Sequence, residues 1–369
     1  MKVLMLSDPG SSHTIKWANA LNNKGIEIFV FGFSDFDKRL YNDKVNVESY
    51  GLSSDLKKKA DGSFSKWVYL KSLNMVKKII DDFKPDLIHV QYATSYGLVG
   101  VLSNFHPLLI QVWGSDVYSF PEKSFLHAKI LKYNLNKADI ILSTSKCMLR
   151  QTKKFTNKDI EFFYLGVDPE KFKPLKIMSF FNTEEIVIGT IKTLEKKYGI
   201  EYKIKAFKIV KDQLPLLQVK LLIVGSGSLE KELKKLVIEY NLENDTVFTG
   251  FIQPKDVPRY YNMLDIYVTL SIEESESFGL AVIEAAACEV PAVVSNVGGL
   301  PEAVEDNVTG FIVESKNVQQ AANALIKLIT DRKLKNKMGK MSRERVIRDF
   351  NWNEKVIEML NLYRKTISG

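Results

Sequence analysis

Short apolar runs rich in Val, Ile and Phe recur along the chain, and each is followed by a longer segment with apolar residues at helical spacing. This alternation is typical of parallel strands joined by crossover helices. The expected strands of the first half are 3–6, 26–31, 87–90, 108–112 and 140–143, and those of the second half are 186–189, 219–224, 246–249, 266–270, 292–295 and 311–313. The sequence therefore predicts an α/β fold.

The two series of strands are separated by a polar segment with two prolines, residues 168–174, which interrupts the periodicity as a linker would. A chain of 369 residues fits two domains at roughly 100–200 residues each. We place the domains at 1–175 and 176–353, each doubly wound, with its ligands beyond the carboxyl ends of its strands. Two such domains facing each other would form a cleft.

The composition is that of a folded globular protein, with 45% hydrophobic and 26% charged residues, which excludes a disordered or fibrous chain. The longest apolar stretch, 98–113, is interrupted by polar residues and a proline, so it does not reach the ~20 residues of a membrane span. The apolar run before Ser7 is too short for a secretory signal, and we expect a cytoplasmic protein. Cys147 and Cys288 lie too far apart for a zinc ribbon, and a disulfide scaffold is not expected.

Positive charge is concentrated in the first half of the chain. The net charge is +8, and residues 1–175 hold 25 basic against 18 acidic residues, whereas the remainder holds 27 against 26. Solvated helix faces are the ordinary explanation, and attraction to an anionic membrane surface or a phosphorylated substrate is the functional alternative. The candidate carriers are Lys57, Lys58, Lys59, Lys77, Lys78, Lys153 and Lys154. We expect no nucleic-acid partner.

The richest candidate chemistry lies in residues 273–288, where an acidic loop follows a strand and precedes a strong helix-forming stretch. A helix starting near Gly279 would present unpaired N–H groups and the positive end of its dipole, which suits a diphosphate. Glu276 precedes this helix and Glu284 lies within it, so a ligand resting on the helix start could meet a carboxylate at each end. Carboxylates are natural acceptors for the hydroxyls of sugar and ribose.

The spacing of Glu276 and Glu284, with Ser-Phe-Gly-Leu between them and Gly-Gly-Leu-Pro-Glu at 298–302, resembles the E-x7-E signature of retaining glycosyltransferases of family 4. The resemblance extends more loosely over the first half of the chain. It implies a GT-B fold, in which two Rossmann-like domains face each other across a cleft and the second holds most of a nucleotide-sugar donor. It also implies that the last helix, about 354–369, packs back on the first domain.

By this resemblance, Glu276 contacts donor sugar hydroxyls and Glu284 holds the ribose. The amides that the family aims at sugar or phosphate correspond to Phe278, Gly279 and Leu280. The family also places an Arg and a Lys five residues apart after the first strand of this domain, to neutralise the departing diphosphate. Lys192 and Lys197 have that spacing, although Lys192 stands where Arg is usual and lacks the bidentate grip of a guanidinium.

Glycines after two further strands could line the same site. Gly225 and Gly227 form a lone G-x-G, for which a tight strand-to-helix turn is an equally good explanation. The resemblance places both at the donor and matches Gly250 and Phe251 to the segment that cups the base.

In the first domain, Gly10, Ser11 and His13 lie in a loop that the resemblance places against acceptor and donor phosphate; a surface or helix-capping imidazole is the alternative for His13. Asp116 matches the family's Gly-(Thr/Ser)-Asp pattern and is kept as a catalytic candidate. Many relatives carry, in place of Trp113, a His that contacts the donor sugar. Because an indole only donates, the role of Trp113 stays open.

Two other functions are compatible with a double α/β pattern. A nicotinamide oxidoreductase would need G-x-G-x-x-G after the first strand, which is absent, and a non-catalytic sugar-nucleotide-binding protein could retain the same fold. Asp35 and Asp37 have the spacing of a metal-binding Asp-x-Asp pair but lack a supporting acidic cluster, so we expect no essential metal and no cofactor. The hypothesis is a retaining, metal-independent transferase that acts on a glycan or lipid-linked acceptor in polysaccharide or glycolipid synthesis. Contact of its basic first domain with the inner face of the cell membrane is a further expectation.

Overall fold

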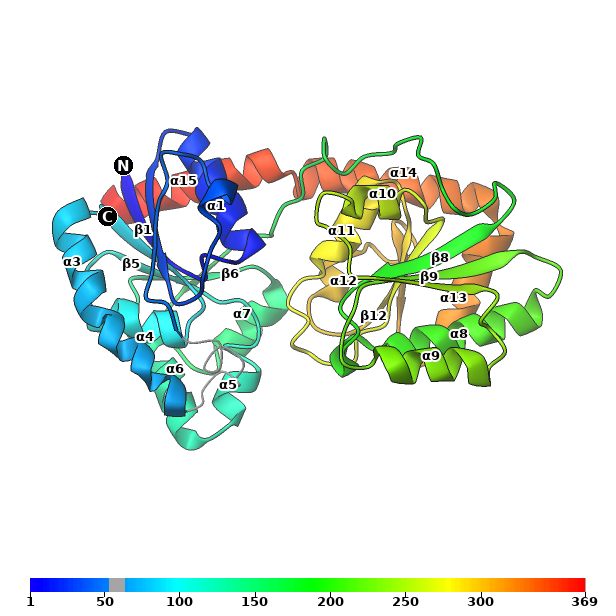
Figure 1. The fold of residues 1–369 in the computed structure, drawn as a ribbon, viewed down its shortest axis with the longest axis horizontal. Helices are drawn as coiled ribbons and strands as arrows, with labels where there is room; N and C mark the ends of the chain where they lie inside the picture. The colour runs from blue at the N-terminus through cyan, green and yellow to red at the C-terminus, as the bar shows by residue number, and fades with distance from the viewer. Residues whose placement is uncertain (53–63, 369) are drawn as a thin grey trace. The chain divides into compact units, whose positions relative to one another are not determined.

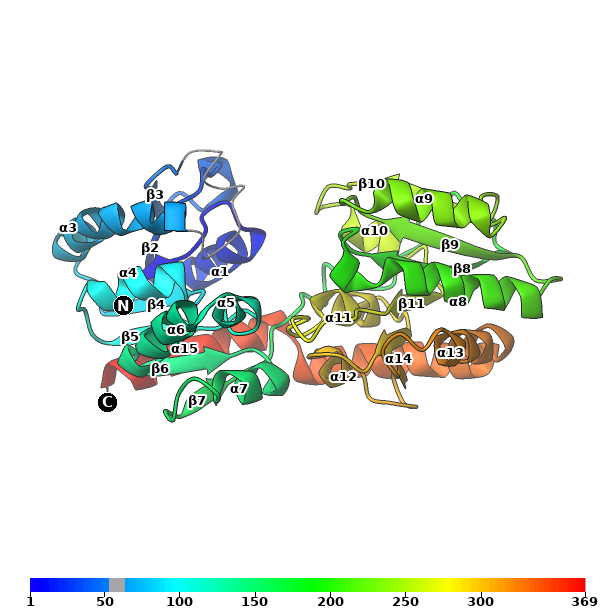
Figure 2. The same ribbon diagram turned by 90° about the horizontal axis from the view of Figure 1, so that it is seen from below.

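The computed structural model describes residues 1–52 and 64–368, and only the backbone of residues 64–67. Lys57, Lys58 and Lys59 lie outside the described residues. The chain divides into two compact units, the first formed by Met1–Tyr164 with Glu354–Gly369 and the second by Leu165–Asn353. Each unit is an α/β structure with helices on both faces of a parallel sheet (Figure 1; Figure 2). The predicted α/β class of doubly wound domains is therefore confirmed.

The sheet of the first unit has, within the described residues, seven strands in the order β3-β2-β1-β4-β5-β6-β7. These strands are β1 (Lys2–Leu6), β2 (Glu27–Gly32), β3 (Asn46–Ser49), β4 (Leu87–Gln91), β5 (Leu108–Gln111), β6 (Ile140–Ser143) and β7 (Ile160–Phe162). The helices are α1 (Ser12–Asn23), α3 (Leu73–Phe83), α4 (Ser95–Leu102), α5 (Ser119–Glu122), α6 (Phe125–Lys137) and α7 (Lys146–Thr152), with the 3₁₀ helices η1 (Lys38–Leu40) and η2 (Phe64–Ser72). The strand order reverses direction between β1 and β4, which is where ligands bind in doubly wound sheets.

The sheet of the second unit has, in the part of the chain described, six strands in the order β10-β9-β8-β11-β12-β13. They are β8 (Ile186–Ile191), β9 (Val219–Val224), β10 (Thr246–Gly250), β11 (Ile266–Thr269), β12 (Ala292–Ser295) and β13 (Gly310–Val313). The helices are η3 (Lys196–Tyr198), α8 (Ile200–Gln213), α9 (Glu230–Glu239), α10 (Val257–Tyr261), α11 (Leu280–Ala287), α12 (Leu300–Ala303), α13 (Val318–Thr330) and α14 (Arg332–Asp349). Here the order reverses between β8 and β11.

Every expected strand is present among the described residues, within two residues at each end. The expected set lacked β3 and β7, which lie at the two edges of the first sheet. The four residues of β3 alternate between exposed and half-buried, and β7 has only three residues, so neither forms an apolar run. Each of these edge strands has only one neighbouring strand, β2 for β3 and β6 for β7.

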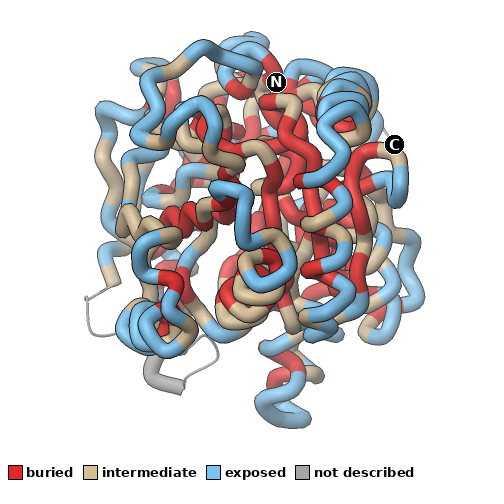
Figure 3. The backbone as a smooth tube through the Cα atoms, turned by 90° about the vertical axis from the view of Figure 1, so that its right-hand side faces the viewer, coloured by how far each residue is buried: buried red, intermediate tan, exposed pale blue. Residues whose placement is uncertain are grey.

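The cores follow from the apolar strand runs, which are buried on both faces. Leu4, Ile88 and Ile110 on three adjacent strands pack into one cluster with residues of α3, α4 and α6. His89 points to the opposite face of β4, where it meets Tyr363 of the last helix, α15 (Trp352–Ser368). Figure 3 shows buried residues concentrated along the strands and exposed residues on the outer sides of the helices.

The structure places the domain boundary earlier than residue 175. Val167 pairs with Asn351, and the Asn262 side chain bonds both the Lys173 carbonyl and the Leu175 N–H. Residues 165–175 are therefore bound to the second unit, in spite of the prolines that suggested a linker.

Two predictions that depend on surface properties can be compared with the described residues. Lys77 and Lys78 on α3, and Lys153 and Lys154 after α7, are exposed, as solvated charges would be. Among the described helices, none combines the length and apolar content that crossing a bilayer requires.

Candidate active site

Glu276 and Lys192 form an ion pair where the strand order of the second unit reverses. Lys192 follows β8, and Glu276 lies in the loop that follows β11. Lys192 Nζ is 3.1 Å from both Glu276 carboxylate oxygens, and Ser271 Oγ donates to Oε2 at 3.1 Å. The side chains are only 16% and 9% exposed, so this pair is shielded from water much more than an ordinary surface ion pair.

The backbone around Glu276 is held by the glycines that the sequence places after β12. Gly299 N–H donates to the Glu276 carbonyl at 2.8 Å, and Gly298 N–H donates to the Glu274 carboxylate at 3.0 Å. A Cβ on Gly298, which has φ +55°, would lie 2.2 Å from the Glu276 carbonyl oxygen. This close approach explains why the loop bearing Glu276 needs two glycines opposite it.

Helix α11 begins directly after Gly279, as predicted. Gly279 has φ +88°, a conformation that side chains disfavour, and a Cβ there would lie 2.7 Å from a Leu300 methyl. The Phe278 ring is buried against Phe350 at 5.5 Å between centroids, so its backbone, rather than its ring, is the part available to a ligand. Leu280 is the first helical residue, and its side chain is half-buried.

Glu284 lies on α11 and is half-buried. The Tyr261 hydroxyl donates to Glu284 Oε2 at 2.9 Å. Burial, together with the charge of Glu284, raises the pKa of Tyr261, so the phenol keeps its proton and acts as a donor. This hydrogen bond orients the Glu284 carboxylate. A carboxylate can accept several hydrogen bonds, so a ligand hydroxyl can also donate to it.

The two lysines predicted for the diphosphate both lie close to one aromatic ring. Lys192 Nζ is 4.5 Å and Lys197 Nζ 4.9 Å from the centroid of Tyr198. A ring face attracts cations, so Tyr198 helps to hold two like charges near each other. Lys196, between them in the chain, is exposed.

Lys203, on α8, has a buried amine that the sequence did not indicate. The residue is 1% exposed, and its Nζ donates to Thr190 Oγ1 at 2.9 Å. Burial lowers the pKa of Lys203 well below its ordinary value, and the charge of Lys192 lowers it further, while Glu276 opposes the shift. The helical apolar spacing around position 203 was the available signal, because it placed a lysine on the buried face.

Gly225 and Gly227 have a packing role in this structure. A Cβ on Gly225 would lie 2.1 Å from the Lys192 carbonyl oxygen, and one on Gly227 2.5 Å from the Leu194 carbonyl oxygen. The glycines therefore let the loop after β9 lie directly against the loop that carries Lys192. Gly250 extends this arrangement, since Gly225 N–H donates to its carbonyl at 3.0 Å, whereas the Phe251 side chain is 70% exposed.

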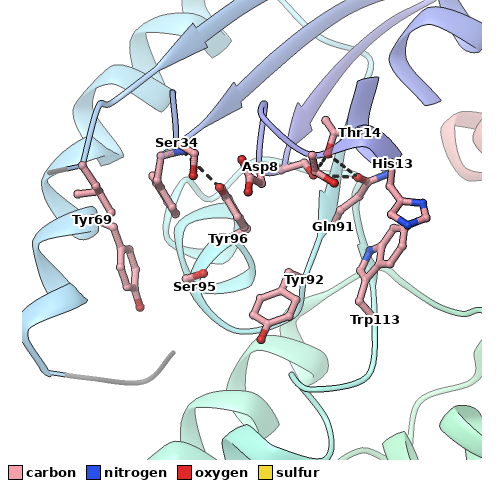
Figure 4. A pocket seen from close by; sticks show the side chains of 14 residues that line it. Asp8, His13, Thr14, Ser34, Tyr69, Gln91, Tyr92, Ser95, Tyr96 and Trp113 are labelled. Carbon is pink, nitrogen blue, oxygen red and sulfur yellow. Dashed lines mark hydrogen bonds between the residues drawn. The ribbon is translucent and has the colours of Figure 1, made fainter. Parts of the chain in front are cut away.

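The first unit has a pocket of about 410 Å³ at its own switch point, between the loops after β1, β2, β4 and β5 (Figure 4). Ser11 and His13 of the predicted loop line it, together with Trp113, whose ring centroid is 5.3 Å from that of His13. Burial and the neighbouring Lys16 lower the pKa of His13, so its imidazole is neutral at pH 7. Gly10 N–H donates to the Asp8 carboxylate at 2.9 Å and shapes the loop rather than lining the pocket.

Asp116 does not fit the catalytic role that the sequence suggested. It is fully buried, and its carboxylate accepts N–H bonds from Ala93, Trp113 and Gly114 at 2.8–3.0 Å. It therefore ties the loop after β4 to the loop after β5, and acts on the pocket by positioning these loops, which carry Tyr92 and Trp113. Trp113 Nε1 is buried and has no hydrogen-bond partner among the described residues.

One member of the Asp-x-Asp pair, Asp37, is used locally. Asp37 caps η1 by accepting the Arg39 N–H and also pairs with the Arg39 guanidinium at 2.7 Å. The hydrogen bonds from Arg39 lower the pKa of Asp37. The absence of an essential metal remains a prediction.

Comparison with known proteins gives one consistent family. A model described as "Glycosyl transferases group 1" matches residues 173–345, and one described as "Glycosyl transferase 4-like" matches residues 2–145. N-acetyl-alpha-D-glucosaminyl L-malate synthase of Bacillus anthracis is 27% identical over 292 residues, which cover 74% of this chain and 72% of that protein.

Two solved structures show the same fold over almost the whole chain. Sucrose-phosphate synthase from Thermosynechococcus elongatus has a TM-score of 0.84 at 22% identity and covers 100% of this chain and 99% of its own. Anabaena Alr3699/HepE in complex with UDP has a TM-score of 0.78 at 21% identity, with 98% and 100% covered.

Proposed function

Because the chain belongs to the family 4 glycosyltransferases, with their GT-B fold, we propose that it transfers a sugar from a nucleoside diphosphate to an acceptor hydroxyl with retention of configuration. The observation that carries the proposal is the shielded Lys192–Glu276 pair beside the start of α11. In this pair, Lys192 supplies a cation for the departing diphosphate and Glu276 supplies an acceptor for sugar hydroxyls. Both lie where the strand order of the second sheet reverses.

The proposed roles follow from the charge and position of each group. Lys192 and Lys197 neutralise the charge that develops on the leaving diphosphate, a form of stabilisation that is strong where water is excluded. Glu276 accepts hydrogen bonds from the donor sugar, and Glu284, oriented by Tyr261, accepts them from the ribose. The N–H groups at the start of α11 also stabilise the negative charge of the diphosphate.

The nucleotide-sugar donor is supported by the Anabaena neighbour, which was solved in complex with UDP. For the acceptor we propose a glycan or lipid-linked hydroxyl bound in the pocket of the first unit. The exposed lysines of α3 and the segment after α7 support peripheral contact with an anionic membrane.

The decisive experiment is a thermal-shift panel with UDP, GDP, ADP and their sugars. A ligand that binds only the folded protein stabilises it by RT ln(1 + [L]/Kd), about 2.7 kcal/mol at a hundredfold excess over Kd. Glu284→Ala should abolish the shift, and Glu273→Gln, at an exposed position of the loop that precedes α11, serves as the matched control. Absence of a shift with every nucleotide would reject the proposed donor site.

Retention is tested separately, by NMR of the anomeric proton of the product formed from a donor sugar of known configuration. Membrane contact is tested by sedimentation with vesicles containing anionic lipid at low and high salt. Binding that does not weaken as salt rises would exclude an electrostatic origin.

A further inference from the structure

The pocket of the first unit has walls made mainly of aromatic side chains. Phe33 lies between two tyrosine rings, with its centroid 4.4 Å from Tyr96 and 5.4 Å from Tyr69, and both pairs are stacked. Tyr92 adds a further ring from the turn after β4 (Figure 4). At about 410 Å³ the pocket lies within the range of roughly 300–1,000 Å³ that is typical of small-molecule sites.

Tyr92 is held in a strained backbone conformation. Its φ is +98°, outside the regions that a bulky side chain prefers, and such residues cost of order 1–3 kcal/mol. The strain is maintained by the Tyr92 N–H bond to the Gln111 carbonyl at 3.0 Å and by the Gly97 N–H bond to the Tyr92 carbonyl at 3.1 Å. The Tyr92 hydroxyl, 2.9 Å from Ser115 Oγ, fixes the far end of the ring. The fold thus keeps this ring at the pocket against a local energetic preference.

The polar groups of the pocket are few, and they suit hydroxyls. Gln91 is 4% exposed; its Oε1 accepts from Ser7 at 2.8 Å, while its Nε2 is buried and has no partner among the described residues. Trp113 Nε1 is a second buried donor of this kind. Of the Asp8 carboxylate oxygens, Oδ1 accepts from Gly10, and Oδ2 has no hydrogen-bond partner within the described part of the chain.

The charge of the pocket disfavours anions. Of the described residues that line it, Asp8 alone carries a charge at neutral pH, because the His13 imidazole is neutral and no Lys or Arg takes part. A carboxylate or phosphate placed here would lie near a like charge, and none of the described side chains that line the pocket is a Lys or Arg that could compensate it. A hydroxyl, in contrast, can donate to Asp8 and accept from the buried N–H donors.

We propose that this pocket binds an uncharged sugar ring of the acceptor, with one face of the ring against Tyr92 and its hydroxyls on Asp8, Gln91 and Trp113. The C–H groups of a sugar face carry slight positive charge and match the negative face of an aromatic ring. The role as acceptor rests on the proposed function, whereas the preference for a neutral sugar rests on the pocket itself. Tyr92 is therefore the specificity-determining residue of the first unit.

The test is saturation-transfer NMR on the full chain without nucleotide. The probes are methyl α-D-glucopyranoside and methyl α-D-mannopyranoside as neutral sugars, with L-malate and myo-inositol 1-phosphate as anions. We expect millimolar binding of at least one glycoside, with transfer concentrated on ring C–H protons, and at least tenfold weaker binding of both anions.

Two variants separate the role of the ring from a role in folding. Tyr92→Gly removes the ring at a φ that glycine adopts freely, so it should fold and should weaken glycoside binding at least tenfold. Tyr92→Phe keeps the ring and should retain most of the affinity, while Tyr133→Ala, at an exposed tyrosine of α6, is the control. Asp8→Asn should weaken the binding of the glycosides and strengthen the binding of the anions relative to them.

Three results would overturn the proposal: no glycoside binding, anion binding as tight as glycoside binding, or unchanged glycoside affinity in Tyr92→Gly. The thermal shift by nucleotides, measured on the same protein, reports on the second unit. Glycoside binding without any nucleotide shift would reject the transferase function and leave the chemistry of the pocket intact. Nucleotide-induced thermal shifts without glycoside binding would reject the sugar-binding role of the pocket and leave the transferase function intact.

Discussion

His89 should make the first unit lose stability as the pH falls below neutrality. The side chain is 1% exposed, with Nε2 3.0 Å from Gln111 Oε1 and Nδ1 2.6 Å from the Tyr363 hydroxyl. Because Gln111 Oε1 can only accept, Nε2 carries the proton and Nδ1 accepts from Tyr363. The neutral ring thus links β4 to α15, and a second proton would remove the acceptor that Tyr363 needs.

The magnitude follows from the pKa. Burial lowers the pKa of His89 from 6.5 to about 4, although the hydrogen bond to Gln111 opposes the shift. The unfolded chain takes up a proton near pH 6.5 and the folded one only near pH 4, so the contribution is complete above pH 6.5 and is lost as the pH falls toward 4. The full difference is about 3 kcal/mol, of which about 2 kcal/mol is lost between pH 7 and pH 4.5.

The direct assay is a titration of the histidine ring protons by NMR, in which His89→Gln identifies one of only four signals. Urea unfolding at pH 7 and pH 4.5 measures the energetic consequence, and His89→Gln should show a smaller decrease than the wild type. Tyr363→Phe, which leaves Nδ1 without its donor, should cost about 1 kcal/mol at pH 7. A His89 signal that titrates near pH 6.5, or an equal pH dependence in His89→Gln, would refute the reasoning.

Further predictions concern the second unit. Lys203→Met should raise the melting temperature at pH 7, because burial lowers the pKa of the Lys203 amine and so destabilises the folded wild type below the ordinary lysine pKa; the difference should shrink as the pH rises toward 10.5. An equal difference at both pH values would contradict a lowered pKa of Lys203. Gly279→Ala should cost about 1–2 kcal/mol and weaken the nucleotide-induced thermal shift, whereas Gly51→Ala, with φ +69° and open space around it, should carry only the backbone cost. Tyr261→Phe should lower the affinity for nucleotide about tenfold by releasing Glu284, and calorimetry showing unchanged affinity would contradict that role.

The structure changes the meaning of several residues that the sequence had singled out. Asp116 matched a family pattern, yet its buried carboxylate is occupied by backbone N–H groups. Gly225 and Gly227 could be identified as a turn, but only the approach of two loops explains why both must lack a Cβ. Tyr92 carried no sequence signal, since its strain arises from hydrogen bonds to residues far along the chain or beyond the turn.

Local sequence patterns were enough to specify the elements and the local chemistry. Apolar runs specify buried strands because their period and length are local properties, and Glu276 and Glu284 flank a helix start that local propensity predicts. Tertiary structure decided the order of the strands, and with it which loops meet at the two switch points. Burial arises in the same way: the pKa of the Lys203 amine is lowered, and Lys192 is paired with Glu276, because of neighbours that are distant in sequence. Charge state depends on desolvation and on nearby charges, and both exist only after the chain has folded.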